Sequence, residues 1–295
     1  TLILKITGNQ FLTSSAVLNA SGTGSASYSA ISIYPSSTGL AIGGDVSGAP
    51  LIDLNGADYV TFDGRVGATG SAKDLSIQNM STSYSAGTST VRFINDANNN
   101  TIKYCTIRGA SRDTSGGMIF FSTTTGTTGN DDNTIDNNNI TNSSDANRPV
   151  NLIYSSGTSG AENSGNTTSN NYIYDFFNRD NVSSAGIYLS NNTTACSITA
   201  NSFYETNTFV PNFSSTFNVI RIANSSGNNF TISNNYIGGT SPNCGTAGSV
   251  ASWTKTNAES NKFYAINIQA GTTNASNVQG NTIKNFSLSN SSSDS

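Results

Sequence analysis

The sequence contains no histidine among its 295 residues. Histidine is the side chain most often used as a general acid or base near neutral pH, and it is a common metal ligand. Its absence excludes a Ser–His–Asp catalytic triad and any metal site that depends on imidazole nitrogens. The enzyme classes that remain to be weighed are a glycosidase that uses carboxylates and a lyase that uses lysine or arginine.

Charge is also scarce, because only 10% of the residues are Asp, Glu, Lys or Arg. A glycosidase needs two carboxylates held about 5–10 Å apart, and 17 acidic residues leave few candidate pairs. The 13 basic residues form no run and the net charge is −4, so we expect no nucleic-acid partner. No apolar run approaches the roughly 20 residues of a membrane-spanning helix, so we also expect no membrane insertion.

Cysteine is rare, and its three copies lack the spacing of a metal site. Cys105, Cys196 and Cys244 are odd in number, so they allow at most one internal disulfide, whose pairing stays open. Cys105 and Cys196 fall at inward positions of the repeat described below. There we expect small buried core residues rather than reactive thiols.

Despite its polarity, the sequence is not typical of a disordered chain. Disordered segments are poor in aromatic and β-branched residues, whereas this chain has 14 Phe, 12 Tyr and many Ile at regular intervals. These residues predict a buried core. Clusters of Asn and Gly between them predict sharp corners, because both residue types tolerate left-handed backbone angles.

A short motif recurs along most of the chain: an apolar residue, two others, an Asn, one further residue and a second apolar residue. Four copies match it fully, centred on Asn138, Asn201, Asn235 and Asn281. Two more match nearly, centred on Asn171 and Cys105. The steps between successive copies are 33, 33, 30, 34 and 46 residues, and such a period indicates a repeat architecture.

Each motif follows a short run of alternating residues, as a half-buried β-strand requires. These runs are residues 91–94, 118–121, 152–154, 187–189, 219–222 and 263–268. One period therefore contains about three short strands and no sustained helical spacing. A single period buries little alone, so it must stack on its neighbours. The sequence predicts an all-β parallel β-helix, a β-solenoid, with three strands per coil of about 30–34 residues.

We expect a single domain over residues 1–295, because no composition break or Pro-rich linker divides the chain. Residues 1–80 repeat less cleanly and form the opening coils, while residues 81–295 form the regular coils. The longest step carries a loop insertion over residues 238–261. Long loops often hold function, but this one also fits a cover over the side of the solenoid, anchored by the only tryptophan, Trp253.

Stacking places residues of one register about 4.8 Å apart in successive coils. The motif residues then form an internal structural ladder of Cys105, Asn138, Asn171, Asn201, Asn235 and Asn281. The amides of such a ladder hydrogen-bond one another and the corner backbone. This pairing matters because a buried amide without partners costs about 1–3 kcal/mol.

The strongest acidic cluster consists of Asp131, Asp132 and Asp136. Their carboxylates and nearby Asn carbonyls offer the oxygen ligands that Ca²⁺ prefers, although a full calcium-loop signature is missing. The alternative is a solvated corner in which Asp accepts hydrogen bonds from the backbone. Calcium is thus a candidate ligand, and the sequence requires no cofactor.

Aromatic residues near the loops are the other binding candidates. Tyr174, Tyr204 and Trp253 lie at coil-to-loop transitions or in the insertion, where aromatic rings suit glycans. The alternative is that these rings cap the core. No residue of the chain receives a catalytic assignment.

Four segments together resemble large β-helical surface proteins of Bacteroidota: Tyr59–Gly64, Lys73–Ile77, Arg92–Ala97 and Asn133–Asn138. The resemblance covers nearly the whole chain. It implies a right-handed parallel β-helix related to the pectate-lyase-like superfamily. It also implies export by the type IX secretion route and a role as an adhesin or filament component.

These observations favour an extracellular structural or adhesive module of the bacterial cell surface, with loops that bind glycans. Many parallel β-helices cleave acidic polysaccharides, so a calcium-dependent, lyase-like enzyme or a carbohydrate-binding module is the alternative. Solenoid ends expose unpaired strand backbone, and neither end of this sequence resembles a capping helix. We therefore expect head-to-tail self-association or contact with adjacent modules of the same protein.

Overall fold

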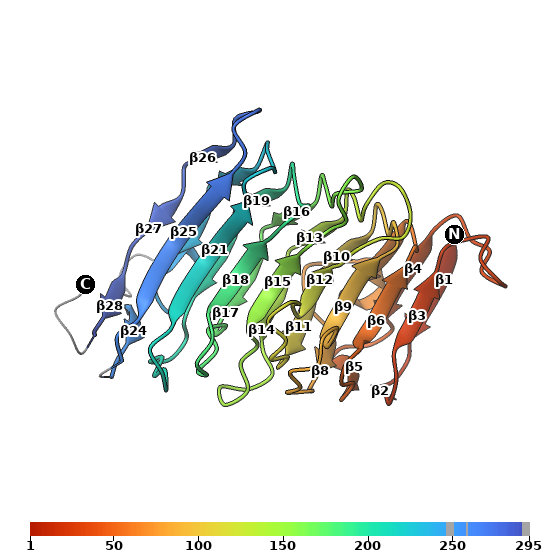
Figure 1. Cartoon of the computed structure of the whole chain (residues 1–295). Coiled ribbons are helices and arrows are strands. Elements are labelled where there is room, and N and C mark those ends of the chain that lie inside the picture. Colours follow the sequence, from red (N-terminus) through yellow and green to blue (C-terminus); the bar gives the residue numbers. More distant parts are fainter. Residues whose placement is uncertain (246–250, 258, 291–295) are drawn as a thin grey trace.

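The computed structural model describes residues 1–245, 251–257 and 259–290, and its strands form an elongated parallel β-solenoid (Figure 1). Three sheets, which we name A, B and C, run along its length. Within the described residues, sheets A and B each contain nine strands and sheet C contains eight. The predicted all-β fold with three strands per coil is therefore confirmed.

The strands follow one another in the order A, B, C around each coil. Sheet A consists of β1 (Leu2–Ile6), β4 (Ile31–Pro35), β7 (Val60–Asp63), β10 (Thr101–Lys103), β13 (Thr134–Asp136), β16 (Thr167–Ser169), β19 (Ser197–Thr199), β22 (Thr231–Ser233) and β26 (Asn277–Gln279). Sheet B consists of β2 (Gln10–Leu12), β5 (Leu40–Gly44), β8 (Leu75–Asn79), β11 (Cys105–Gly109), β14 (Asn139–Asn142), β17 (Tyr172–Tyr174), β20 (Ser202–Tyr204), β23 (Tyr236–Ile237) and β27 (Thr282–Ile283). Sheet C consists of β3 (Ala16–Asn19), β6 (Pro50–Asn55), β9 (Ser89–Ile94), β12 (Ile119–Phe121), β15 (Asn151–Ser155), β18 (Ser184–Leu189), β21 (Thr216–Asn224) and β25 (Lys262–Ala270).

The strand register follows the sequence repeat residue for residue. In sheet A the first apolar position of each motif pairs with that of the next, in the order Ile102, Ile135, Thr168, Ile198, Ile232 and Val278. In sheet B the second apolar position does the same, in the order Ile107, Ile140, Ile173, Phe203, Ile237 and Ile283. Except at the last coil, these side chains are buried and form the core.

The corner between sheets A and B explains why the motif has its spacing. The residue just before each ladder position adopts a left-handed backbone, with φ between 50° and 70° at Tyr104, Asn137, Asn170, Ala200, Asn234 and Gly280. Asn and Gly adopt this conformation at little cost. The resulting sharp corner turns the ladder side chain into the interior, between the strands of sheets A and B.

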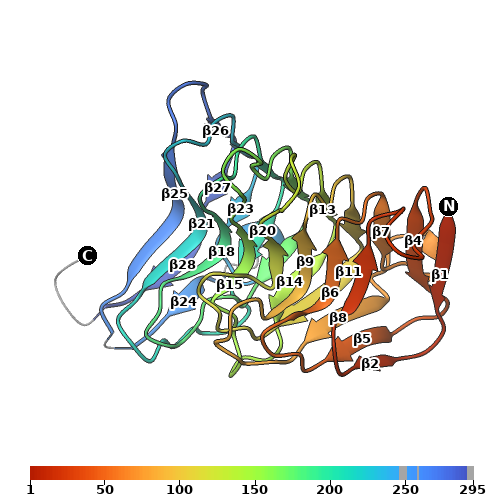
Figure 2. The same cartoon turned by 45° about the vertical axis from the view of Figure 1, so that its right-hand side comes forward.

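Residues 1–80 form coils that join the same three sheets, through β1 to β8 (Figure 2). At the other end, β24 (Trp253–Lys255) pairs with β28 (Phe286–Leu288) in a small parallel sheet. Two short 3₁₀ turns, η1 (Val66–Ala68) and η2 (Pro242–Cys244), complete the elements. Part of the predicted insertion, residues 246–250 and 258, lies outside the described residues. No helix among the described residues has the length and hydropathy of a membrane span.

Candidate functional site

The ladder asparagines form one continuous chain of hydrogen bonds through the interior. The Oδ1 atom of Asn171 accepts from the backbone N of Asn138 at 2.8 Å and from its Nδ2 at 3.1 Å. The same two bonds join Asn171 to Asn201, Asn201 to Asn235 and Asn235 to Asn281. Each Nδ2 also donates to a backbone carbonyl at the preceding sheet A strand, as from Asn171 to Ile135 at 2.8 Å.

Cys105 occupies the ladder register of its coil and is fully buried, with its backbone N donating to Oδ1 of Asn138 at 2.9 Å. Cys196 and Cys244 are also buried, and all three cysteines are free thiols. Burial raises the pKa of the Cys105 and Cys196 thiols, in the case of Cys196 to about 12. Cys105 and Cys196 therefore lie in the core as small apolar residues, and their thiols are poor nucleophiles.

A second set of ladders, which the sequence interpretation missed, lies at the corner between sheets C and A. Asn100 donates from its backbone N and its Nδ2 to Oδ1 of Asn133, and Asn133 does the same to Asn166. Asn130 and Asn163 form another such pair. The signal was present in the sequence, because these residues also recur at 33-residue steps.

The candidate calcium residues lie in two different corners, and two of them, Asp131 and Asp136, accept hydrogen bonds from the protein. Asp131 accepts a hydrogen bond from the backbone N of Ser164 at 2.7 Å, and Asp132 is exposed with a left-handed backbone. Asp136 accepts from the Ser169 hydroxyl at 2.7 Å and from Nδ2 of Asn170 at 2.9 Å. Among the described residues, no three His, Cys, Asp or Glu side chains gather as a metal site. Calcium binding here stays a prediction, and the corner geometry fits the backbone-capping alternative.

The two tyrosines predicted to bind ligands stack on each other. Tyr174 of β17 and Tyr204 of β20 are register partners, with ring centroids 5.0 Å apart and planes inclined by 11°. Tyr204 is 7% exposed, and burial raises the pKa of both hydroxyls. Each ring covers one face of the other, which reduces the ring surface that the pair offers to a ligand.

Trp253, the third predicted binding residue, is 1% exposed in β24. Its ring contacts the rings of Phe176, Phe263 and Phe286, with centroid distances of 5.7, 5.7 and 5.6 Å. This packing agrees with the interpretation that the insertion covers the side of the solenoid. The insertion does not fill all of the space beside the Trp253 indole ring.

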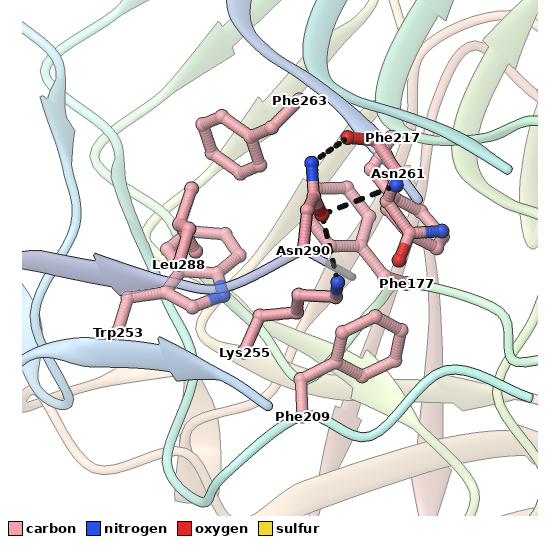
Figure 3. A pocket seen from close by; sticks show the side chains of 9 residues that line it. All are labelled: Phe177, Phe209, Phe217, Trp253, Lys255, Asn261, Phe263, Leu288 and Asn290. Atoms are coloured by element: carbon pink, nitrogen blue, oxygen red, sulfur yellow. Dashed lines mark hydrogen bonds between the residues drawn. The ribbon is translucent and has the colours of Figure 1, made fainter. Parts of the chain in front are cut away.

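That space is a cavity of about 350 Å³ between the insertion and the last coils (Figure 3). Its apolar walls are the side chains of Phe177, Phe209, Phe217, Trp253, Phe263 and Leu288. Phe217 and Phe263 are register partners in sheet C, while Phe177 and Phe209 come from loops that leave sheet B. Of the three predicted binding residues, Trp253 lines the cavity, and neither Tyr174 nor Tyr204 does so in the described structure.

Three polar side chains complete the cavity: Lys255, Asn261 and Asn290. The Lys255 ammonium donates to the backbone oxygens of Glu259 and Ser289 and to Oδ1 of Asn290. Burial lowers the pKa of this ammonium, and the charge of Glu259 opposes the shift. Lys255 thereby ties β24 to the chain segment that follows β28.

Behind Phe209 lies a buried ion pair that the sequence interpretation also missed. Both terminal nitrogens of Arg148 bind the two carboxylate oxygens of Glu205, at 3.0 and 2.6 Å. Their side chains are 1% and 0% exposed, and the Arg148 guanidinium lies 5.1 Å from the Phe209 ring centroid. Asp145, which is 54% exposed, also binds Arg148 from the solvent side. The pair supports one wall of the cavity.

Fold and site together define a parallel β-solenoid with internal asparagine ladders and an aromatic cavity at its C-terminal end. Comparison with protein-family models, with curated proteins and with solved structures gives no match for this chain. Its function must therefore be argued from its own residues.

Proposed function

We propose that this chain is a structural module of an extracellular bacterial surface protein, in which coils continue from one module into the next. The proposed lineage is that of the large β-helical surface proteins of Bacteroidota, within the pectate-lyase-like superfamily. The support comes from the two ends of the solenoid, where side chains in core register are uncovered.

At the N-terminal end, Leu4 pairs in register with Ile33, which is buried, yet Leu4 itself is 37% exposed. Beside it lies an apolar hollow of about 190 Å³, whose walls include Ile6, Leu12 and Leu18. These side chains face the interior of the coil, and the first coil leaves one side of them open. Exposed apolar patches of this kind are typical of interaction surfaces.

At the C-terminal end the same pattern appears. Val278 pairs with the buried Ile232, and Ile283 pairs with the buried Ile237, but Val278 and Ile283 are 48% and 50% exposed. The strands β26 and β27 are also the last of sheets A and B, so one edge of each is unpaired within the described residues. An unpaired strand edge is a template for a further parallel strand.

The N-terminal end of one copy is complementary in strand direction to the C-terminal end of another copy, whereas two N-terminal ends or two C-terminal ends are not. All sheets are parallel, so an added coil keeps the strand direction only when the first coil of one copy meets the last coil of another. Such a head-to-tail contact repeats without closing and produces a filament. The low charge of the chain, with 10% charged residues, is compatible with close stacking.

A matched pair of variants tests this proposal. Leu4→Lys places a charge on the inward side of β1, whereas Ile3→Lys places the same charge on its outward side, where Ile3 is 55% exposed. We expect the unmodified protein and Ile3→Lys to form rods that lengthen with concentration in sedimentation velocity and electron microscopy. Leu4→Lys should remain monomeric. A monomeric unmodified protein at all concentrations, or rods of Leu4→Lys, would refute the proposal.

A further inference from the structure

The cavity beside Trp253 is lined by none of the exposed end residues on which the stacking proposal rests, namely Leu4, Val278 and Ile283. We infer that it is a binding site for a small neutral aromatic compound with one hydrogen-bond donor, of which a phenol is the simplest example. This inference is independent of the proposed structural role. It depends on the shape of the cavity walls and on the hydrogen bonding of the three polar residues that line it.

The walls fit a flat ring. Phe209 and Phe217 meet at an interplanar angle of 88°, and Trp253 and Phe263 meet at 84°, so ring faces and ring edges both border the cavity. Aromatic guests gain from edge-to-face and offset contacts of this kind. The volume of about 350 Å³ lies within the range of small-molecule sites, roughly 300–1,000 Å³.

The Lys255 ammonium in the cavity wall does not require an anionic ligand. An ammonium group has three hydrogens, and those of Lys255 have three acceptors: the Glu259 and Ser289 carbonyls and Oδ1 of Asn290. A carboxylate that bound Lys255 would have to displace one of these oxygens. The site therefore favours a neutral compound.

Asn261 provides a hydrogen-bond acceptor beside the cavity that is unpaired within the described residues, which favours a ligand with a hydrogen-bond donor. Nδ2 of Asn261 donates to the Phe213 carbonyl at 3.0 Å and to the Ser215 carbonyl at 3.4 Å, which fixes the orientation of the amide. Its Oδ1 is buried and has no hydrogen-bond partner among the described residues. Figure 3 shows this carboxamide on the side of Phe177. A buried acceptor gains most from a donor, so the inference requires a small shift of Asn261 that brings Oδ1 to a ligand hydroxyl while its Nδ2 stays near the Phe213 and Ser215 carbonyls.

A pair of isosteric probes tests the inference. 4-Methylphenol and p-xylene share the ring and the size and differ only in a hydroxyl against a methyl group. Trp253 is the only tryptophan and lines the cavity, so its fluorescence reports binding directly. We expect 4-methylphenol to bind about tenfold more tightly than p-xylene, the ratio for one satisfied buried acceptor.

Two variants locate the donor contact. Asn261→Leu should keep p-xylene binding and reduce the preference for the phenol to about threefold or less, since the acceptor is gone. Asn207→Leu, at an exposed residue outside the cavity, should leave the preference unchanged. If Asn261→Leu does not fold, 4-methylanisole replaces it as the test on the unmodified protein, because it keeps the oxygen but lacks the hydrogen. It should bind no better than p-xylene.

Three results would overturn the inference. The first is no change in Trp253 emission with either probe. The second is a phenol preference that persists in Asn261→Leu or is shared by 4-methylanisole. The third is tighter binding of 4-methylbenzoate than of 4-methylphenol, which would show that Lys255 recognises an anion.

Discussion

Replacing Asn171 with alanine removes the central member of the ladder between sheets A and B. Its Oδ1 accepts two hydrogen bonds from Asn138, and its Nδ2 donates to the Ile135 carbonyl and to Oδ1 of Asn201. The N–H of Asn138 is then left buried without its partner, which costs about 1–3 kcal/mol. Loss of the other three bonds, at about 0.5–1.5 kcal/mol each, raises the expected loss of unfolding free energy to about 5 kcal/mol.

Urea unfolding followed by circular dichroism measures this loss, and two further variants calibrate it. Asn191→Ala, at an exposed corner residue, should change the unfolding free energy by less than about 0.5 kcal/mol. Asn281→Ala removes equivalent bonds in the last coil, where Asn281 is only half-buried, and water replaces part of them. Its effect should lie between the other two. A loss below about 1 kcal/mol for Asn171→Ala would refute the role given to the ladder.

Three further predictions concern single residues. Ala200 has a left-handed backbone with φ of 56°, and three equivalent corners have Asn, which adopts this conformation with less strain. Ala200→Asn should therefore raise the unfolding free energy by about 0.5–1 kcal/mol in urea titrations. An unchanged unfolding free energy would contradict the backbone strain assigned to Ala200. Burial raises the pKa of the Asp96 carboxyl, but hydrogen bonds from Thr124, residues 127–128 and Gly129 outweigh burial and lower it below 3.8. The ionised Asp96 carboxylate therefore stabilises the fold above the unfolded pKa, and this stabilisation is lost as the pH falls through the lower pKa of the folded state. Asp96→Asn should melt at a lower temperature than the unmodified protein at pH 6, and this difference should become smaller as the pH is lowered through that pKa. A difference that does not change with pH would contradict this. The cysteines are buried, so a thiol reagent should label none in the native protein and all three in urea; rapid native labelling would contradict the core assignment.

The sequence was sufficient to predict the register of the coils. An inward Ile and an inward Asn recur at fixed spacing, and a shift by one residue would turn both to the outside. For this reason the predicted partners Asn138 and Asn171, 33 residues apart, are bonded in the structure. The first coils were harder to interpret because their ladder register holds Leu40 and Leu75, which lack the Asn signature. In sheet B, Leu75 pairs with Cys105 and Leu40 pairs with Leu75.

The cavity and the ion pair were beyond the reach of the sequence pattern. Phe177 and Phe209 lie in loops outside the repeat and contact each other, and Phe177 also contacts Phe263 of β25 and Trp253 of the insertion. Likewise, Arg148 and Glu205 are 57 residues apart and occupy loops of different lengths. Such contacts depend on loop conformation, which no periodicity specifies.

The account depends most on the stacking of residues about 33 positions apart, and a high-resolution crystal structure measures that stacking directly. We predict Nδ2 of Asn138 and Oδ1 of Asn171 within hydrogen-bond distance, near 3.1 Å, with Asn201 in the same line. Asn138 and Asn171 far apart, or either of them in a helix, would contradict the solenoid and every inference drawn from it.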